Sequence, residues 1–346
     1  MTLLLDGIVF SLQPHGGISV YFHELLKRLR RDAVPTLLTL DGTLRQAAPP
    51  GGSAVKTLVR PARLLERYRN CRVPPGTSPA VFHSTYYRRP SQALPSLVTV
   101  HDFTYERFAR GPRRWTHSAQ KLAAIRAADA VVCVSQATMD DLMEFVGLRP
   151  GQQGHVVHNG VSESFRSQSV AAAARPFALY VGQRGGYKNF ALALRAMQHV
   201  PDLDLVCVGG GAFTADELSE APGSVRQRLR HAGFVSDAQL NTLYNQAQCL
   251  VYPSRYEGFG IPVAEAMRAG CPVVSIDCKG VRETGGDALT IAEDEASAFA
   301  LAIGLTAEAS HRAEKVSRGH ALAARYTWEA NYQATRALYR KLAGVI

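Results

Sequence analysis

The sequence has no long hydrophobic run and no paired-cysteine motif. Its longest unbroken apolar stretches, such as Leu205 to Phe213, reach about nine residues, roughly half of the ~20 that a membrane-spanning helix needs. Six cysteines are scattered without a CxxC pair, mostly inside apolar runs, so we expect buried thiols. The first residues, MTLLLDGIVF, lack a cationic leader, which predicts a first strand and a cytoplasmic protein.

Two signatures of other protein classes are also missing. No GxGxxG follows the first apolar run, which argues against an ordinary dinucleotide oxidoreductase. Neither a helix-turn-helix spacing with a basic face nor the aromatic pattern of RNA-recognition modules is found. A basic nucleic-acid-binding protein therefore remains only as an alternative.

Acidic residues are scarce in one segment. Between Lys56 and Asp129 there are fourteen Lys or Arg and four Asp or Glu, so this segment carries the whole chain's formal charge of +10. A concentrated basic face needs an anionic partner such as nucleic acid, anionic phospholipid or a phosphorylated acceptor. A solvated arginine-rich surface is the competing interpretation.

Length and pattern predict two domains. The 346 residues exceed what one core usually holds, and strand-length apolar runs alternate with helical periodicity, as in parallel α/β units. A Ser, Gln and Ala-rich stretch from 167 to 175 predicts a hinge. We therefore expect an N-terminal Rossmann-like domain over 1–168 and a second over 175–326. A last helix over 327–346 is long enough to pack across a domain boundary.

Short apolar runs mark the expected strands, and several end in polar residues. In open parallel sheets ligands bind beyond the carboxyl ends of the strands, so the pattern predicts a cleft between two facing sheets. A helix is expected over 262–269, with proline at its start and Gly270 after its end. The predicted strands are Leu3 to Phe10, Leu97 to Val100, Ala130 to Val134, Val156 to His158, Phe177 to Val181, Leu203 to Val208, Cys249 to Tyr252 and Val273 to Ile276.

The segment YPSRYEGFGIPVAEAMRAG, from Tyr252 to Gly270, is the most informative. Glu257 lies in a glycine-flanked loop, and Glu265 lies on the helix that this loop feeds. The amides of Gly258 to Gly260, including Phe259, precede a helix N-terminus, whose partial positive charge suits phosphate. Carboxylates placed there can accept hydrogen bonds from sugar or ribose hydroxyls, although two solvated glutamates would give the same pattern.

The pattern EGFGxPxxEAMxxGxPVV, met here from Glu257 to Val274, resembles the signature of the retaining glycosyltransferases of family 4. Segments along nearly the whole chain agree with it in the same order. They are GGIS at 16–19, HD at 101–102, VS at 134–135, HNGV at 158–161, YVGQRGGYKNF at 180–190 and GFVSDAQLNTLY at 233–244. The resemblance implies the GT-B architecture, two Rossmann-like domains with a C-terminal helix crossing back to the first.

The resemblance also implies roles for individual residues. Arg184 and Lys188 match a basic pair that grips the donor diphosphate, where fixed cations stabilise the charge of the leaving group. Glu265 matches the glutamate that binds ribose hydroxyls, and Glu257 the one near the donor sugar. A strand-end histidine, His101, matches one that contacts the transferred sugar.

Four more positions complete the implied donor site. Gly16 and Gly17 match a loop that approaches the diphosphate, where the absence of a β-carbon allows close backbone approach. Phe234 and Val235 fall where the family places backbone contacts to the base. No metal or other cofactor is implied, and the acidic pair Asp202 and Asp204 is interpreted as capping and surface.

Two segments, YVGQRGGYKNF at 180–190 and DGIVFSLQPHGGISVYF at 6–22, resemble bacterial enzymes of O-antigen and related surface-polysaccharide assembly that use GDP-mannose or GDP-rhamnose. The resemblance thus implies transfer of a hexose to a polyprenyl-diphosphate-linked or other lipid-linked glycan, by a front-face route or by double displacement through Glu257. The basic segment fits peripheral attachment to an anionic membrane at the inner face of the plasma membrane. A GT-B phosphorylase or epimerase acting on a nucleotide sugar is the closest alternative.

Overall fold

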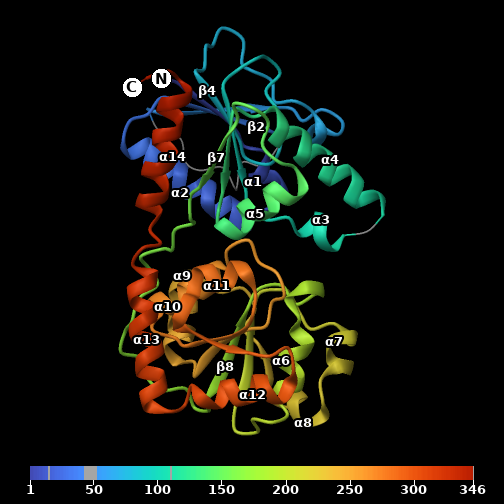
Figure 1. Ribbon diagram of the computed structural model, residues 1–346, viewed down its shortest axis with the longest axis vertical. Coiled ribbons are helices and arrows are strands. Elements are labelled where there is room, and N and C mark those ends of the chain that lie inside the picture. Colours follow the sequence, from blue (N-terminus) through green and yellow to red (C-terminus); the bar gives the residue numbers. More distant parts are fainter. Residues whose placement is uncertain (15, 43–52, 110, 346) are drawn as a thin grey trace. The chain divides into compact units, whose positions relative to one another are not determined.

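The computed structural model describes residues 1–14, 16–42, 53–109 and 111–345, with the backbone alone for 112–116. The chain forms two compact units (Figure 1), one of Met1–Gly160 with Trp328–Ile346 and one of Val161–Thr327. The division thus falls at 160/161, whereas the sequence expectation places it between 168 and 175. The reason is local, because the backbone amides of Arg166 and Gln168 donate to the Asn241 and Asn245 side chains of the second unit.

In the first unit, the described strands form one parallel sheet in the order β3-β2-β1-β4-β5-β6-β7. All four residues of β1, β4 and β6 are buried, as expected for a sheet covered on both faces. The strands are β1 (Leu3–Asp6), β2 (Thr36–Asp41), β3 (Val55–Arg60), β4 (Val81–Ser84), β5 (Ser96–Val100), β6 (Ala130–Cys133) and β7 (Gln153–Val156).

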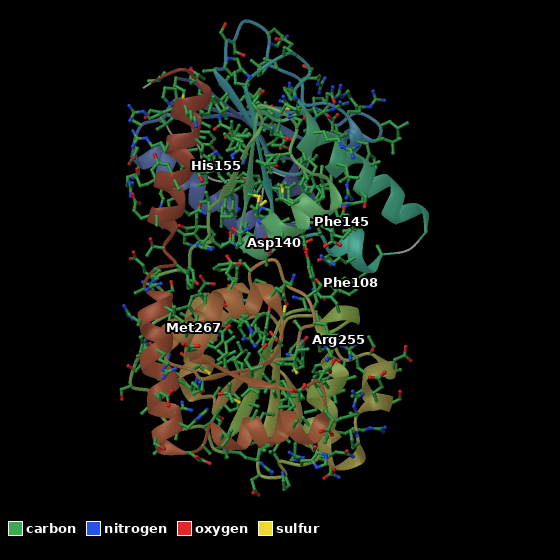
Figure 2. The ribbon with its side chains drawn as sticks, in the orientation of Figure 1. Phe108, Asp140, Phe145, His155, Arg255 and Met267 are labelled. Atoms are coloured by element: carbon green, nitrogen blue, oxygen red, sulfur yellow. The ribbon has the colours of Figure 1, made fainter. Side chains whose placement is uncertain are left out.

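Helices between these strands pack their apolar faces on the sheet. α2 buries Tyr21, Phe22, Leu25, Leu26 and Leu29, a helical stripe, and its other face is charged. α3 and α5 meet through Phe103 stacked on Phe145, which is labelled in Figure 2. The helices are α1 (Ile8–Leu12), α2 (Gly17–Arg31), η1 (Glu66–Tyr68), α3 (Thr104–Phe108), α4 (Pro112–Ala127), α5 (Gln136–Phe145) and α14 (Trp328–Leu342).

The predicted strand Leu3 to Phe10 is wrong beyond Asp6. The chain turns at Gly7, where a β-carbon would lie 2.3 Å from Leu40 Cδ2, and α1 follows at once. Asp6 is fully buried and accepts hydrogen bonds from Thr85 N and Oγ1 at 2.9 and 2.6 Å. A buried carboxylate held this way ends the strand, although the apolar run continues. The predicted strand at 156–158 is likewise shifted, because β7 ends at Val156.

In the second unit, the described strands form a parallel sheet in the order β10-β9-β8-β11-β12-β13. The predictions for 177–181, 249–252 and 273–276 match the observed bounds. The strands are β8 (Phe177–Val181), β9 (Asp204–Val208), β10 (Leu229–His231), β11 (Cys249–Tyr252), β12 (Val273–Ile276) and β13 (Leu289–Ala292).

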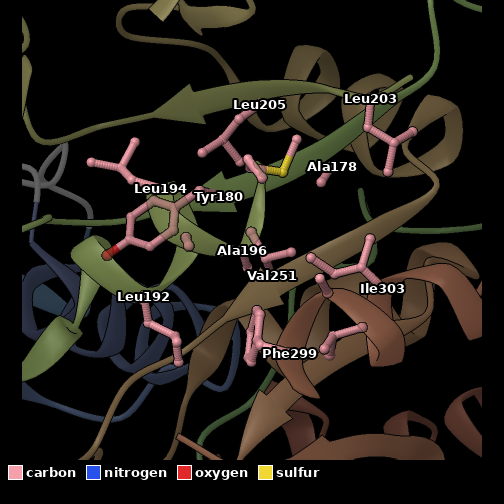
Figure 3. Close-up of a cluster of buried hydrophobic side chains, with 14 of the residues drawn as sticks. Ala178, Tyr180, Leu192, Leu194, Ala196, Leu203, Leu205, Val251, Phe299 and Ile303 are labelled. Carbon is pink, nitrogen blue, oxygen red and sulfur yellow. The ribbon is translucent and has the colours of Figure 1, made fainter. Parts of the chain in front are cut away.

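One side of this sheet packs against α6 and α12 through the cluster of buried side chains in Figure 3, which includes Tyr180, Leu194, Leu205, Phe299 and Ile303. The helices are η2 (Gly186–Lys188), α6 (Phe190–Ala196), α7 (Ala215–Glu220), α8 (Gly223–Arg226), α9 (Asp237–Gln246), α10 (Ile261–Ala269), α11 (Lys279–Gly285), η3 (Gly286–Ala288), α12 (Ala296–Leu305) and α13 (Ala309–Ala323).

The two sheets confirm the predicted pair of parallel Rossmann-like units, and α14 belongs to the first unit, as expected. All six cysteines are buried and free. Among the described residues, no helix combines the length and apolarity needed to cross a membrane. Asp204 is not a surface residue, because it is buried and lies 3.0 Å from Arg175 Nε and 2.7 Å from Arg230 NH2.

Candidate functional site

The second unit brings Lys188 and Glu257 together at the carboxyl ends of β8 and β11. Lys188 Nζ lies 2.6 Å from Glu257 Oε1, and both side chains are largely buried. Burial, together with the nearby Glu257 carboxylate, raises the pKa of Tyr252 well above its usual range. This charge pair stands where ligands bind in open parallel sheets, and it comes from two loops almost seventy positions apart in the sequence.

The loop from Glu257 to Gly260 leads into α10. Gly260 has φ +91°, a left-handed conformation that favours glycine, and it turns the chain into the helix. The helix begins at Ile261 with Pro262 in its first turn, one residue before the predicted start. This nine-residue helix ends at Ala269, and Gly270, which has φ +78°, caps it. The amides at this helix N-terminus carry partial positive charge.

α11 fixes the position of the same loop. A β-carbon on Gly280 would lie 2.2 Å from the Glu257 carbonyl oxygen, so only glycine lets the helix approach the loop this closely. Thr284, one turn later, donates from Oγ1 to the Phe259 carbonyl at 2.5 Å. The Phe259 ring meets the Tyr326 ring edge-on at 5.1 Å. Packing against α11 and Tyr326 therefore orders the loop.

Glu265 lies on α10 and is partly buried beside Tyr244 of α9. Tyr244 is fully buried, and its hydroxyl donates to Glu265 Oε2 at 3.0 Å. Burial raises the pKa of Glu265 to about 7, and the Tyr244 hydrogen bond partly offsets this effect. Burial thus moves the titration of this carboxyl group toward neutral pH.

Arg184 lies apart from the Lys188–Glu257 pair. Its guanidinium is buried and binds Glu217 of α7 (Nε to Oε1, 2.9 Å) and a series of backbone carbonyls. These are Gly209 at 2.8 Å, Gly210 at 3.3 Å, Gly211 at 2.9 Å and Ala212 at 2.9 Å. Three consecutive glycines with φ from +73° to +82° aim these carbonyls at one point. In the structure, Arg184 therefore organises the glycine loop after β9.

Loops near Arg184 frame a pocket of about 580 Å³. It is lined by residues 183–186, the start of α6, α7 and Arg255, the last of which is labelled in Figure 2. Lys188, Glu257 and Glu265 are not among its lining residues. The predicted base-contacting loop lies after β10, where Gly233 has φ +73° and the Phe234 side chain is 84% exposed, followed by partly buried Val235.

The remaining predicted residues lie in the first unit. Gly16 caps α2, which begins at Gly17, and a β-carbon on Gly16 would lie 2.6 Å from Gln13 Oε1. His101 follows β5 and meets the Tyr21 ring edge-on at 5.3 Å. Its Nε2 is buried and has no hydrogen-bond partner among the residues that the structure describes. Burial lowers the pKa of His101 to about 4, so the ring is neutral at pH 7 and can donate or accept one hydrogen bond at Nε2.

Two family models match the chain in succession. Residues 15–165 match the model described as Glycosyltransferase Family 4, and residues 161–318 match Glycosyl transferases group 1. Both units of the chain thus match glycosyltransferase family models. The two matches meet at the division between the two units.

Curated relatives align with part of the chain. O-antigen chain mannosyltransferase B of Escherichia coli is 33% identical over 171 residues, 47% of this chain and 45% of that protein. Alpha-maltose-1-phosphate synthase of Mycolicibacterium smegmatis is 30% identical over 187 residues, 48% of each chain. The alignments thus span about half the length of these relatives, whose names differ in the sugar that they handle.

Solved structures share the fold over the full length. Sucrose-phosphate synthase from Thermosynechococcus elongatus has a TM-score of 0.80 at 20% identity, with complete coverage of both chains. Anabaena HepE in complex with UDP-glucose has a TM-score of 0.73 at 16% identity and covers 99% of this chain. These likenesses confirm the GT-B fold expected from the resemblance to family 4.

Several residues of this site were missed by sequence reasoning. Tyr244, Gly280 and Thr284 hold Glu265 or the loop that precedes it, and Tyr252 lies near Glu257. Tyr244 falls in the quoted segment 233–244, but the partner of its buried hydroxyl, Glu265, is 21 positions away. Tyr252 opens the most informative segment, yet nothing in that segment shows that its side chain is buried near Glu257. Gly280 carries no signal in one sequence, since its role depends on the approach of the Glu257 backbone.

Proposed function

We propose that the chain is a retaining glycosyltransferase that transfers a hexose of the mannose or rhamnose class from a GDP-linked sugar to a lipid-linked oligosaccharide in surface-polysaccharide assembly. The observation that carries the proposal is the 2.6 Å contact between Lys188 Nζ and Glu257 Oε1 beside the loop that enters α10. A fixed cation and helix amides suit a departing diphosphate. The match to an O-antigen chain mannosyltransferase supports the sugar class.

The proposed chemistry is a front-face displacement. The bond between the sugar C1 and the diphosphate oxygen breaks, the acceptor hydroxyl forms its bond to C1 on the same face, and its proton passes to the leaving phosphate. Glu257 is held by Lys188, which lowers its reactivity as a nucleophile and favours this route over double displacement. Lysine and helix amides supply the positive charge, so we propose no metal requirement. A covalent sugar trapped on Glu257 would establish the other mechanism.

A panel of nucleotide sugars tests the activity. GDP-mannose, GDP-rhamnose and UDP-glucose are each incubated with the protein, with and without a polyprenyl-diphosphate-linked oligosaccharide, and release of nucleoside diphosphate is measured. We expect release with a GDP-sugar only when the acceptor is present, and an NMR spectrum showing that the anomeric configuration is retained. An altered nucleotide sugar without acceptor would indicate an epimerase, and dependence on inorganic phosphate would indicate a phosphorylase.

Lys188→Met isolates the proposed cation. Loss of one fixed group that stabilises developing charge typically lowers kcat by about 10²–10³-fold, and we expect a fall of this size. Lys315→Met is the matched control, because Lys315 donates to the Asp287 carbonyl away from the site. Equal kcat values for wild type and Lys188→Met would remove the electrostatic basis of the proposal.

We also propose that the basic segment docks on an anionic membrane. Its loop exposes Leu64 and Leu65 by 81% and 64%, and Tyr68 lies beside them. Two arginines of this segment are already paired with carboxylates and are less able to bind lipid phosphates. Arg60 pairs with buried Asp41 at 3.0 Å, and Arg63 pairs with Glu66 at 2.7 Å. Arg69 has an exposed side chain next to the leucines and donates Nε to the Leu64 carbonyl.

Vesicle co-sedimentation tests this docking surface. With vesicles rich in phosphatidylglycerol, we expect Leu64→Ser and Arg69→Gln each to lower binding about fivefold, since one cation near such a surface contributes about 1 kcal/mol. Leu301→Ser and Lys27→Gln remove an exposed leucine and an exposed lysine elsewhere and should change nothing. Equal binding to neutral vesicles, or no effect of the two loop variants, would contradict the proposal.

A further inference from the structure

The carboxylate of Glu265 is held from one side by α9. Tyr244 is 0% exposed, and its hydroxyl lies 3.0 Å from Glu265 Oε2 and 3.3 Å from the Pro262 carbonyl oxygen. Burial and the neighbouring carboxylate raise the pKa of Tyr244 well above its usual range, so the hydroxyl keeps its proton. Tyr244 is therefore a hydrogen-bond donor to Glu265 when that carboxyl group is ionised, with the Pro262 carbonyl as a second, longer acceptor.

The same helix connects this hydrogen bond to the predicted base-contacting loop. α9 begins directly after residues 233–235, and its first turn is fixed by a capping box in which Ser236 accepts from the Gln239 amide. Tyr244 lies two turns further on, where its ring meets Phe165 edge-on at 5.9 Å. The helix is thus anchored at both ends, and the Tyr244 hydroxyl has little freedom to leave Glu265.

We propose that Tyr244 is a positioning residue, whose hydroxyl holds Glu265 Oε2 so that Oε1 is oriented to accept hydrogen bonds from the ribose of the donor nucleotide. This inference rests on the proposed function, and it adds a specific task for a residue that touches neither sugar nor phosphate. A hydrogen bond from a neutral donor to an ionised acceptor also favours the ionised form.

The ionisation of Glu265 has few local determinants. Besides burial, the groups that act on it are Tyr244 and Asp237, both on α9. Elsewhere around α10, Arg268 donates to the Phe165 carbonyl, and His320 of α13 lies 3.1 Å from Ser167 near the far end of the helix. Because the Tyr244 hydrogen bond lowers the pKa of Glu265, we expect loss of the hydroxyl to raise this pKa and to favour the protonated carboxyl group near neutral pH.

Calorimetric titration of the full chain with GDP and with UDP, from pH 5.5 to pH 9, tests the inference. Wild-type affinity should rise as pH increases through about 7, because an ionised carboxylate accepts ribose hydrogen bonds better than a carboxylic acid. Tyr244→Phe should bind about tenfold more weakly at pH 7, and its pH midpoint should move upward by about one unit, which is the shift that a tenfold change represents. At pH 9 the difference from wild type should therefore shrink.

Two further variants separate positioning from general destabilisation. Glu265→Gln should flatten the pH dependence, and Tyr244→Phe added to it should cause no further loss. Tyr332→Phe is the matched control, because it removes another buried tyrosine hydroxyl donated to a carboxylate, Asp32 at 3.0 Å in the first unit, and it should keep the wild-type midpoint.

The outcomes distinguish this inference from the function on which it rests. A Tyr244→Phe defect that persists undiminished in the Glu265→Gln background, or an unchanged affinity, would overturn the positioning role while nucleotide binding stands. If the wild-type chain binds neither GDP nor UDP at any pH, the nucleotide-sugar function is overturned and the inference falls with it.

Discussion

Arg184 and Lys188 carry the same charge four residues apart, but their surroundings differ. Lys188 pairs with one carboxylate that itself belongs to the predicted site. Arg184 divides its donors between Glu217 and the carbonyls of a glycine loop. The planar fork of a guanidinium can satisfy several acceptors at once, which an ammonium group cannot reproduce.

Arg184→Lys distinguishes a role in loop ordering from a role as a bare charge. We expect the variant to lose about 1–3 kcal/mol of unfolding free energy, because the loop carbonyls and Glu217 lose donors in a buried setting. Hydrogen exchange should become faster in residues 209–212. A variant with wild-type stability and exchange but weaker GDP binding would instead support the predicted grip on the diphosphate.

His83 makes a different kind of prediction, one of pH dependence. It is buried between Tyr339 and Thr99, with Nδ1 2.5 Å from the Tyr339 hydroxyl and Nε2 2.9 Å from Thr99 Oγ1. Burial, aided by neighbouring His101, lowers its pKa to about 3. Below about pH 6.5, His83 is protonated in the unfolded chain but stays neutral in the folded chain. The free energy of unfolding therefore falls as the pH decreases from 6.5 toward 3.

We expect the titration of His83 to lower the free energy of unfolding by about 1.4 kcal/mol for each pH unit in that range. His83→Gln should therefore show a shallower loss than wild type in urea unfolding at pH 6.5, 5.5 and 4.5. Parallel curves for the two proteins would show that His83 does not titrate on unfolding as argued.

At the scale of elements, α11 is the helix that positions the Glu257 loop. Gly280 has no side chain and so lets the helix approach the loop backbone, and the Thr284 hydroxyl donates to the Phe259 carbonyl. Both residues position the loop and do not themselves belong to the predicted ligand contacts. The contact that Gly280 permits is with backbone atoms, which cannot move aside as the end of a flexible side chain does. A single methyl group is therefore enough to disturb the loop.

Gly280→Ala should weaken GDP binding strongly and lower the unfolding free energy by about 1–3 kcal/mol, the usual effect of forcing an extra carbon into a packed site. Gly304→Ala in α12 is the control, since a β-carbon there meets nothing within 4 Å. That change should raise stability by up to about 1 kcal/mol, because alanine loses less backbone entropy in a helix. Urea unfolding and GDP titration check both, and equal behaviour of the two variants would refute the steric argument.

At the scale of the whole molecule, the last segment of the chain, from Trp328 onward, belongs to the first unit. Gly160 packs against Trp328, where a β-carbon would lie 2.2 Å from the Trp328 backbone nitrogen. Between these two residues the chain forms the entire second unit. α14 then buries Tyr332 and Tyr339 in the first unit, so the folding of that unit depends on residues from both ends of the sequence.

Tyr339→Ala tests this dependence. Removing a large buried aromatic side chain typically costs about 3–5 kcal/mol, and we expect that loss to be confined to the first unit. Hydrogen exchange read by mass spectrometry should show reduced protection in residues 1–160 and 328–345, with the second unit unchanged. Equal loss of protection in both units would show that they unfold together.

Sequence patterns alone determined the α/β class, the paired parallel sheets and the strands at 177–181, 249–252 and 273–276. Continuous apolar runs bounded by turn residues specify such strands locally. The motif around Glu257 and Glu265 identified the family and pointed to both glutamates, and it places them on a loop and on a helix of known polarity. These features depend on neighbours within about ten positions.

Only the tertiary structure decided what each charged or buried group touches. The early end of β1 depends on Thr85, the surroundings of Arg184 depend on Glu217 and residues 209–212, and the carboxylate of Glu265 depends on Tyr244. Hydrogen bonds and close packing act over a few ångströms between residues that lie tens of positions apart. A residue's type states which contacts it can make, whereas the fold determines which of them it does make.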